Sequence, residues 1–218
     1  MQQRKSKKIL IYLFLLFIVG SVNNINLNDL KFHDISSINI SGLDVKDKSI
    51  LLKKIKNLNL DNIFLVNRNN LINEIELNSL VEKYFIFKRY PSSIDINIEK
   101  TKFLAKINKN GRIFYVGSNG KFIKNNTSNN ELPFIFGNPE VFEFFKIKEI
   151  IDKSKISYTE IKNLYFFPSK RWDLELIDNT LIKLPNDNIS LALNLAIEFL
   201  DDNKFIDARI ENQIILND

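Results

Sequence analysis

The chain opens with a run of apolar positions that directly follows a basic cluster. Ile9 to Val22 contains no charged side chain. The basic residues before it are Arg4, Lys5, Lys7 and Lys8. As a helix, this run spans about 21 Å, short of the roughly 30 Å hydrocarbon core of a bilayer. Two interpretations remain open: a cleaved signal peptide, or a transmembrane signal anchor over residues 9–25 behind a cytoplasmic tail of residues 1–8. Both export the rest of the chain, because the basic cluster stays inside.

The next pattern predicts a small unit in the order strand, helix, helix, strand, strand. Alternating apolar positions predict a strand from Phe32 to the Ser41-Gly42 turn, and Asp47 is predicted to cap the helix that follows. A second helix is predicted from near Asn69, with an apolar face that reaches Leu80 and Val81. Two strands, over residues 84–88 and 94–98, complete the unit. Such a unit packs two helices on one face of a small sheet and leaves strand edges open.

After Lys100 the spacing of apolar positions changes, and it predicts a region of mostly short strands with flanking helices. Asn110-Gly111 is a strong hairpin signal between two alternating segments. Strands are predicted over residues 103–107, 113–116, 122–123, 161–167, 172–177, 181–184 and 205–216, with helices over 140–153 and from Ile189 to Leu200. The final strand, 205–216, is read as one element that ends the chain. The whole chain is therefore predicted to be α+β behind an N-terminal apolar helix.

Charge and composition then exclude several function classes. The net charge is +5, but four of the 31 Lys and Arg residues lie in the first 22 positions, leaving 27 basic against 26 acidic side chains afterwards. A nucleic-acid binder carries its positive charge on the folded domain, so nucleic acid is not an expected partner. The absence of cysteine and the single histidine, His33, exclude thiolate and multi-histidine metal sites.

Catalytic motifs are also missing. Ser118-Asn119-Gly120-Lys121 matches a serine-x-x-lysine spelling, but it lies in a predicted turn and its partner motifs do not occur. Six glycines in the whole chain can hardly furnish a phosphate-binding loop. We therefore expect no cofactor, no metal, no small-molecule substrate and no enzymatic activity.

Several short phrases occur in an order typical of one bacterial family. They are Ser41-Gly42, Tyr90-Pro91-Ser92-Ser93-Ile94, Glu99 followed by Ala105, Ser118-Asn119-Gly120, Leu132-Pro133 with Gly137, Lys170-Arg171-Trp172-Asp173-Leu174, Lys183-Leu184-Pro185 and Ile206-Asp207-Ala208-Arg209-Ile210. With the basic leader and the apolar segment, they make the chain resemble the FtsQ/DivIB family of cell-division proteins over nearly its whole length.

The resemblance implies an organisation and a role. Residues 31–100 would form a POTRA domain, and residues 101–218 a β domain. The protein would be a non-catalytic scaffold of the divisome, anchored by a single pass in the bacterial cytoplasmic (inner) membrane, with its C-terminal part in the periplasm at the septum. Its β domain would bind FtsB and FtsL, which are single-pass division proteins.

Partner contacts are expected at two places in the β domain. Charged contacts are assigned to Lys170 and Arg171, although Arg171 equally suits a role over the domain's own surface. Edge contacts are assigned to Arg209, Ile210, Gln213, Ile214 and Leu216, because a strand near a chain end often lies at a sheet edge that a partner can extend. The rival interpretation is that residues 210–216 only complete the core. Trp172 is expected to be a core residue.

Two other functions stay open at this point. One is a different exported POTRA-containing protein that handles outer-membrane or secreted substrates, although the strand pattern of a C-terminal membrane barrel is missing. The other, less favoured, is a cleaved, secreted enzyme.

Overall fold

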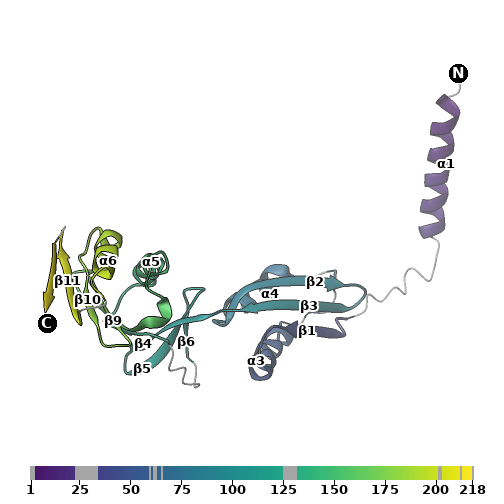
Figure 1. The fold of residues 1–218 in the computed structure, drawn as a ribbon. Helices are drawn as coiled ribbons and strands as arrows, with labels where there is room; N and C mark the ends of the chain where they lie inside the picture. The colour runs from purple at the N-terminus through teal and green to yellow at the C-terminus, as the bar shows by residue number, and fades with distance from the viewer. Residues whose placement is uncertain are drawn as a thin grey trace.

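The computed structural model describes residues 3–22, 34–58, 60, 63–64, 66–124, 132–200, 203–211 and 213–217. An N-terminal helix comes first in the chain, then a three-stranded unit and a nine-stranded unit. These two units lie end to end (Figure 1). His33, the single histidine, lies outside the described residues.

Helix α1 (Gln3–Val22) carries the apolar run. Every side chain from Ile9 to Val19 is exposed. Among the helices that the structure describes, none combines the length and the apolar character needed to cross a membrane. The transmembrane anchor predicted over residues 9–25 is therefore not confirmed, and residues 23–25 lie outside the described part of the chain.

The three-stranded unit has the predicted order of elements. It consists of β1 (Ser37–Ser41), α3 (Val45–Lys56), α4 (Arg68–Glu76), β2 (Val81–Arg89) and β3 (Ser93–Lys100). Strand β3 is central, parallel to β1 and antiparallel to β2. The core contains residues of both helices and alternate residues of β3: Leu51, Ile55, Leu71, Ile75, Ile94, Ile96 and Ile98. This period-2 burial explains the alternation seen in the sequence.

Two helix boundaries in this unit differ from the prediction. Helix α3 begins at Val45, because Asp44 is extended (φ −63°, ψ 156°) and its carbonyl accepts from the Lys48 N–H at 2.8 Å. Asp47, the predicted cap, lies inside the first turn. Helix α4 ends at Glu76, well before the predicted apolar face ended. The Asn78 Oδ1 atom there accepts from the Leu80 N–H at 3.0 Å, which supports a turn instead of further helix.

The nine-stranded unit is a mixed sheet. Its strands are β4 (Phe103–Lys109), β5 (Arg112–Gly117), β6 (Phe122–Ile123), β7 (Phe134–Phe136), β8 (Ile161–Phe166), β9 (Trp172–Leu176), β10 (Leu181–Lys183), β11 (Phe205–Ile210) and β12 (Gln213–Asn217). They lie in the order β12-β11-β10-β9-β8-β7-β4-β5-β6. Parallel pairing joins β7 to β8 and β10 to β11, and the intervening segments contain α5 (Val141–Asp152) and α6 (Ile189–Ile197). A short 3-10 helix, Tyr158–Glu160, precedes β8. The predicted α+β class is confirmed.

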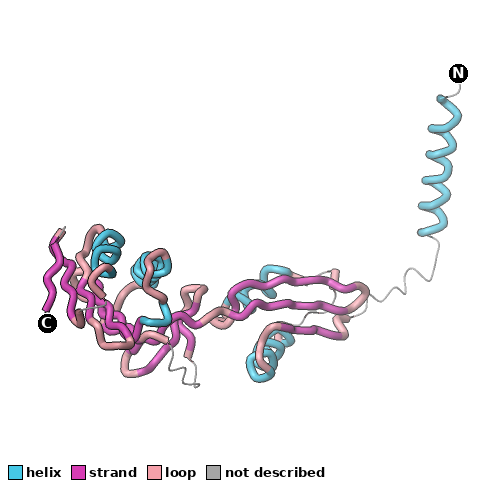
Figure 2. Tube along the Cα trace, in the orientation of Figure 1, coloured by secondary structure: helices cyan, strands magenta, loops and turns pink. Residues whose placement is uncertain are grey.

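One face of the nine-stranded sheet carries both helices (Figures 1 and 2). Phe144 and Ile147 of α5 and Leu193 of α6 are fully buried in its core. Trp172 is 2% exposed and its ring lies 4.8 Å from that of Phe166, measured between centroids, so the expectation of a core tryptophan is confirmed.

The final strand was predicted wrongly. Residues 205–216 form two antiparallel strands, β11 and β12, which meet in a hairpin near Glu211. Ile206 pairs with Leu216, and Asp207 pairs with Ile215. Ile206 and Ala208 of β11 and Ile214 of β12 all pack in the helix-covered core, so the even-numbered alternation continues past the reversal and does not reveal it. The register of the two strands shifts between Asp207 and Ile210, where Ile210 pairs with Gln213. As a result, β11 is internal and only β12 lies at this end of the sheet.

Candidate functional site

The strand at one end of the sheet, β12, carries three of the residues assigned to the edge. Gln213, Ile214 and Leu216 all belong to it. Ile214 packs partly against the core, and the neighbouring Ile215 is 44% exposed on the opposite face. The other two assigned residues, Arg209 and Ile210, end the adjacent strand β11. The structure therefore brings these five residues together at one hairpin.

A groove of about 320 Å³ lies between this hairpin and helix α6. Its lining comes from the β10–α6 connection, from α6 and from the hairpin: Pro185, Asn186, Asp187, Asn188, Leu191, Ala192, Leu195, Ala208, Arg209, Ile210, Glu211 and Gln213. Leu191 is 70% exposed and Ile210 is 53% exposed. The groove thus offers apolar side chains immediately beside the sheet edge.

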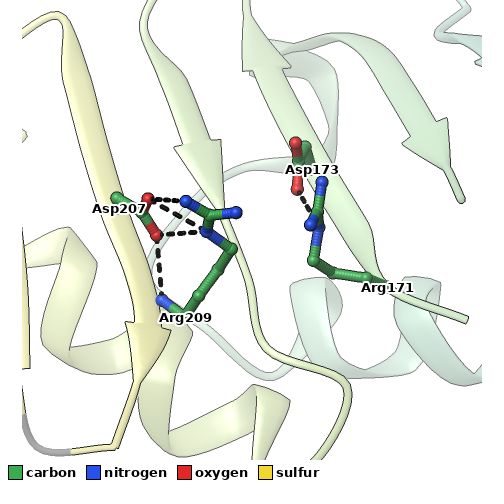
Figure 3. Close-up of polar contacts among 4 residues, drawn as sticks. All are labelled: Arg171, Asp173, Asp207 and Arg209. Carbon is green, nitrogen blue, oxygen red and sulfur yellow. Dashed lines mark hydrogen bonds and ion pairs between the residues drawn. The ribbon is translucent and has the colours of Figure 1, made fainter. Parts of the chain in front are cut away.

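The opposite, helix-free face of the sheet carries two arginine–aspartate pairs (Figure 3). Directly before β9, the Arg171 Nε–H donates to Asp173 Oδ1 at 3.1 Å. On β11 Arg209 makes three side-chain hydrogen bonds to Asp207, through Nε and Nη2, at 2.5 to 2.9 Å. The two members of each pair are two residues apart along extended chain, which places both on the same face.

Both aspartates are almost fully buried, but their pKa values shift in opposite directions. The several hydrogen bonds from Arg209 lower the pKa of Asp207. Burial raises the pKa of Asp173. Arg171 lowers this pKa, but by less than burial raises it, since Arg171 makes only a single hydrogen bond to Asp173. Lys183 of β10 lies directly opposite both aspartates in the strand register, and its charge favours both carboxylates. The three strands therefore carry a row of alternating charges.

The two charged residues assigned to partner binding differ in their surroundings. Lys170 lies in the β8–β9 turn with φ at +62°, its side chain is 73% exposed, and its Nζ atom is 3.9 Å from Glu143. Arg171 is largely occupied within the chain: besides Asp173, it lies over the Phe167 ring with its Cζ 4.2 Å from the centroid. Arg171 and Arg209 share the helix-free face, two strands apart, which is about 10 Å.

The sequence argument missed the acidic and lysine members of this row. Asp173, Lys183 and Asp207 received no role of their own. The signal was available, since Arg171-x-Asp173 and Asp207-x-Arg209 both place opposite charges at strand spacing on one face. Among the residues that the structure describes, no three acidic or histidine side chains gather in a way that could hold a metal ion.

Comparison with known proteins agrees with this architecture. The family model for the C-terminal part of cell division protein FtsQ/DivIB matches residues 99–210, and the model for the FtsQ-type POTRA domain matches residues 34–100. Cell division protein DivIB of Staphylococcus aureus strain NCTC 8325 is 25% identical over 138 residues, and that of strain MRSA252 is 24% identical. The aligned region is 62% of this chain and 31% of each relative.

A solved structure is also similar. It is the major extracytoplasmic domain of the trans isomer of the cell division protein DivIB from Geobacillus stearothermophilus, with 12% identity and a TM-score of 0.31. The match covers 38% of this chain and 76% of that chain. A TM-score this low does not establish a shared fold.

Proposed function

We propose a partner-binding role from one premise: the chain belongs to the FtsQ/DivIB family of cell division proteins. The protein acts as a non-catalytic scaffold of the division complex at the septum. It captures single-pass division proteins of the FtsB and FtsL kind by adding a strand of the partner to β12. The observation that carries this proposal is the open edge of β12 beside the α6 groove.

The proposed layout assigns a place to each part of the chain. Residues 1–8 form a cytoplasmic tail and residues 9–25 a signal anchor in the inner membrane, with Lys7 and Lys8 reaching the interface. Residues 31–100 form the POTRA domain and residues 101–218 the β domain, both in the periplasm. The apolar side chains of α1, exposed from Ile9 to Val19, support this anchor.

The two edges of the nine-stranded sheet differ in a way that favours β12 as the binding strand. Strand β6 at one end has two residues, whereas β12 has five. Proteins blunt open edges with short strands, prolines, bulges or charged side chains. The β12 segment Gln213–Asn217 contains no proline and no charge, and the irregularity in its ladder with β11 lies toward the hairpin turn, between Asp207 and Ile210. An open edge of this kind is suited to strand addition.

The strand register indicates which backbone groups face a partner. The Leu181 N–H donates to the Lys204 carbonyl at 2.9 Å, so even-numbered residues of β11 direct their backbone groups toward β10. Odd-numbered residues of β11 then face β12, where Asp207 pairs with Ile215. It follows that Ile214 and Leu216 direct their N–H and C=O groups outward.

The groove and the charged face supply selectivity beyond the backbone bonds. Apolar partner side chains on the helix-covered face meet Leu191 and Ile210 in the groove. On the other face, the Arg209 side chain is 43% exposed although it is paired with Asp207. Its exposed part can therefore also contact an acidic residue of a partner. Main-chain bonds give affinity in strand addition, while side-chain pockets give specificity.

The test removes one outward donor and leaves the hairpin paired. Leu216→Pro deletes an outward N–H, which an edge strand tolerates. We expect binding of FtsB, measured with the full-length protein in detergent or nanodiscs, to weaken roughly tenfold. The matched control, Ile215→Ala, trims an exposed side chain of the same strand and keeps every backbone group. Its binding should stay near that of the wild type.

Two results decide between interpretations. Unchanged FtsB capture by Leu216→Pro, with unaltered Trp172 fluorescence, would refute strand addition at β12. Intact mass and membrane fractionation test the anchor separately: full mass in the inner-membrane fraction supports it, and a soluble form that begins near Val22 contradicts it. The soluble form would instead favour the two alternatives without an anchor, a different exported POTRA-containing protein or a secreted enzyme.

A further inference from the structure

The turn between β5 and β6 reaches across to the three-stranded unit. It contains Ser118, Asn119, Gly120 and Lys121, the segment whose serine-x-x-lysine spelling has no catalytic partner motifs. Three of its side chains bond to residues of the neighbouring unit. We call these four residues the clasp turn.

Asn119 is the centre of the clasp turn. Its Nδ2 atom donates to the carbonyl oxygens of Ser79 and Val81, at 2.9 and 2.8 Å. Its Oδ1 atom accepts from the Lys121 N–H at 3.0 Å. Both amide hydrogens thus go to the other unit, while the amide oxygen holds the turn itself. An aspartate has the same shape but neither donor.

The side chains on either side of Asn119 add further bonds. The Ser118 hydroxyl donates to Glu82 Oε2 at 2.7 Å. The Lys121 ammonium donates to the Glu76 carbonyl, the last residue of α4, at 2.5 Å. Cations favour the carboxyl end of a helix, because the last carbonyls there lack helical partners.

The local backbone is shaped for this contact. A Cβ atom on Gly117 would lie 2.6 Å from Asn119 Oδ1 and 2.9 Å from Thr101 Oγ1, so a larger residue would displace the clasp. Gly120 has φ at +75°, a conformation that side chains rarely adopt. Thr101, 5% exposed, bonds through its N–H to the Leu80 carbonyl at 2.9 Å. The junction is therefore closely packed around its hydrogen bonds.

We propose that the clasp turn locks the nine-stranded unit in one orientation against the three-stranded unit, with Asn119 as the main positioning residue. Domains joined by a short connection move relative to one another unless specific contacts hold them. Only Thr101 and Lys102 separate β3 from β4, and these backbone-directed bonds oppose rotation about that connection. The lock itself does not depend on partner binding. The further statement, that it holds β12 in place for a partner, rests on the proposed function.

The experiment measures a distance distribution across the junction. Because the chain contains no cysteine, Lys53→Cys on α3 and Lys146→Cys on α5 provide exposed spin-label sites in the full chain. A second pair, Lys146→Cys with Asn194→Cys on α6, lies within the nine-stranded unit. We expect Asn119→Asp to broaden the 53–146 distribution by roughly a factor of two and to leave 146–194 unchanged. The control, Asn108→Asp, makes the same change at an exposed position of β4.

Each outcome decides the proposal. The lock is refuted if the 53–146 distance distribution of Asn119→Asp is as narrow as that of the wild type. Equal broadening by Asn108→Asp also overturns it, since the effect would then follow from charge alone. If Asn119→Asp broadens the 146–194 control, Ser118→Ala is measured in its place, and a narrow 53–146 distribution there refutes the lock. FtsB binding by the same variants is scored separately, so failure of the partner proposal leaves this result standing.

Discussion

Glu175 holds a small polar cluster on the helix-free face of the sheet. The Tyr165 hydroxyl and the Asn163 amide donate to its Oε2 atom at 2.6 and 2.9 Å, and Lys162 lies 2.9 Å from Oε1. The Glu175 side chain is only 16% exposed. These hydrogen bonds, that of Asn163 first, lower the pKa of Glu175 from 4.5 to about 2. The carboxylate is therefore a stabilising element of the folded state.

The perturbation is Glu175→Gln, which keeps the shape and removes the charge. One pKa unit corresponds to about 1.4 kcal/mol, so a change from 4.5 to about 2 sets an upper value near 3.4 kcal/mol. Lys162 is 45% exposed, so solvent screening reduces its share, and we expect a loss of about 2 kcal/mol at pH 7. For a chain of this size that lowers Tm by roughly 6 °C.

The sign of the pH dependence follows from the direction of the shift. Because the folded pKa is depressed, the stabilisation is fully present above the unfolded value of 4.5 and is lost as pH falls toward about 2. The gap in unfolding free energy between wild type and Glu175→Gln should therefore be about 2 kcal/mol at pH 7, smaller at pH 4 and close to zero near pH 2.

The assay is denaturant unfolding followed by Trp172 fluorescence. Trp172 is the only tryptophan, it is buried, and it lies on the same strand as Glu175. The control is Glu149→Gln, which breaks an exposed pair with Lys153 and should cost no more than about 0.5 kcal/mol. A gap that stays constant from pH 7 to pH 3, or that is absent at pH 7, would refute the reasoning.

Two further predictions concern backbone space and a buried hydroxyl. Gly42→Ala should destabilise the three-stranded unit by about 3 kcal/mol or more, because its Cβ atom would lie 1.7 Å from the Ile98 carbonyl oxygen at a φ of +89°. The control, Gly111→Ala, has no atom within 4 Å of its Cβ and should cost only about 1 kcal/mol because of its positive φ. Limited proteolysis of the two variants compares their stabilities. Tyr158→Phe should lower the free energy of unfolding by about 1 kcal/mol, because the Tyr158 hydroxyl donates to the Leu104 carbonyl at 3.0 Å. Burial also raises the pKa of Tyr158, so this tyrosine ionises only at very high pH. In an ultraviolet titration, the variant should therefore lack one tyrosine of this late-ionising class.

The elements that the sequence predicted correctly are those with a local cause. Asn110-Gly111 closes the β4–β5 hairpin as expected, with both residues at positive φ. Strand β7 was missed, because it pairs in parallel with β4 and β8, which come from distant parts of the chain, so no local hairpin signal marks it. The equally short β6 and β10 pair antiparallel with the strands just before them, and they were predicted. The β11–β12 reversal was missed for a different reason, since both strands keep the same alternation. Strand order depends on contacts between distant segments, and no local pattern encodes it.

The candidate site was predicted in its position and only in part in its composition. The edge residues from Arg209 to Leu216 do meet at one hairpin, but as an internal strand and an edge strand. The groove needs Leu191 of α6, whose exposed apolar side chain looked like any other position of an amphipathic helix. The contacts that suggest a role for Asn119 could not be predicted either, because its partners are backbone carbonyl groups, which the side-chain pattern does not encode.

The width of the sheet separates the clasp turn from β12, the strand that we propose binds a partner. Strand β6, which directly follows the clasp turn, and β12 lie at opposite ends of nine strands. Eight spacings of about 4.8 Å put the two edges roughly 38 Å apart along the sheet. A rotation of about 10° at the clasp would therefore move β12 by roughly 7 Å, more than one strand spacing. Under the proposed function, a partner anchored in the same membrane would then meet an edge displaced by more than one strand spacing. Loss of the hydrogen bonds at Asn119 would therefore have its largest effect on the position of the residues farthest from the clasp turn.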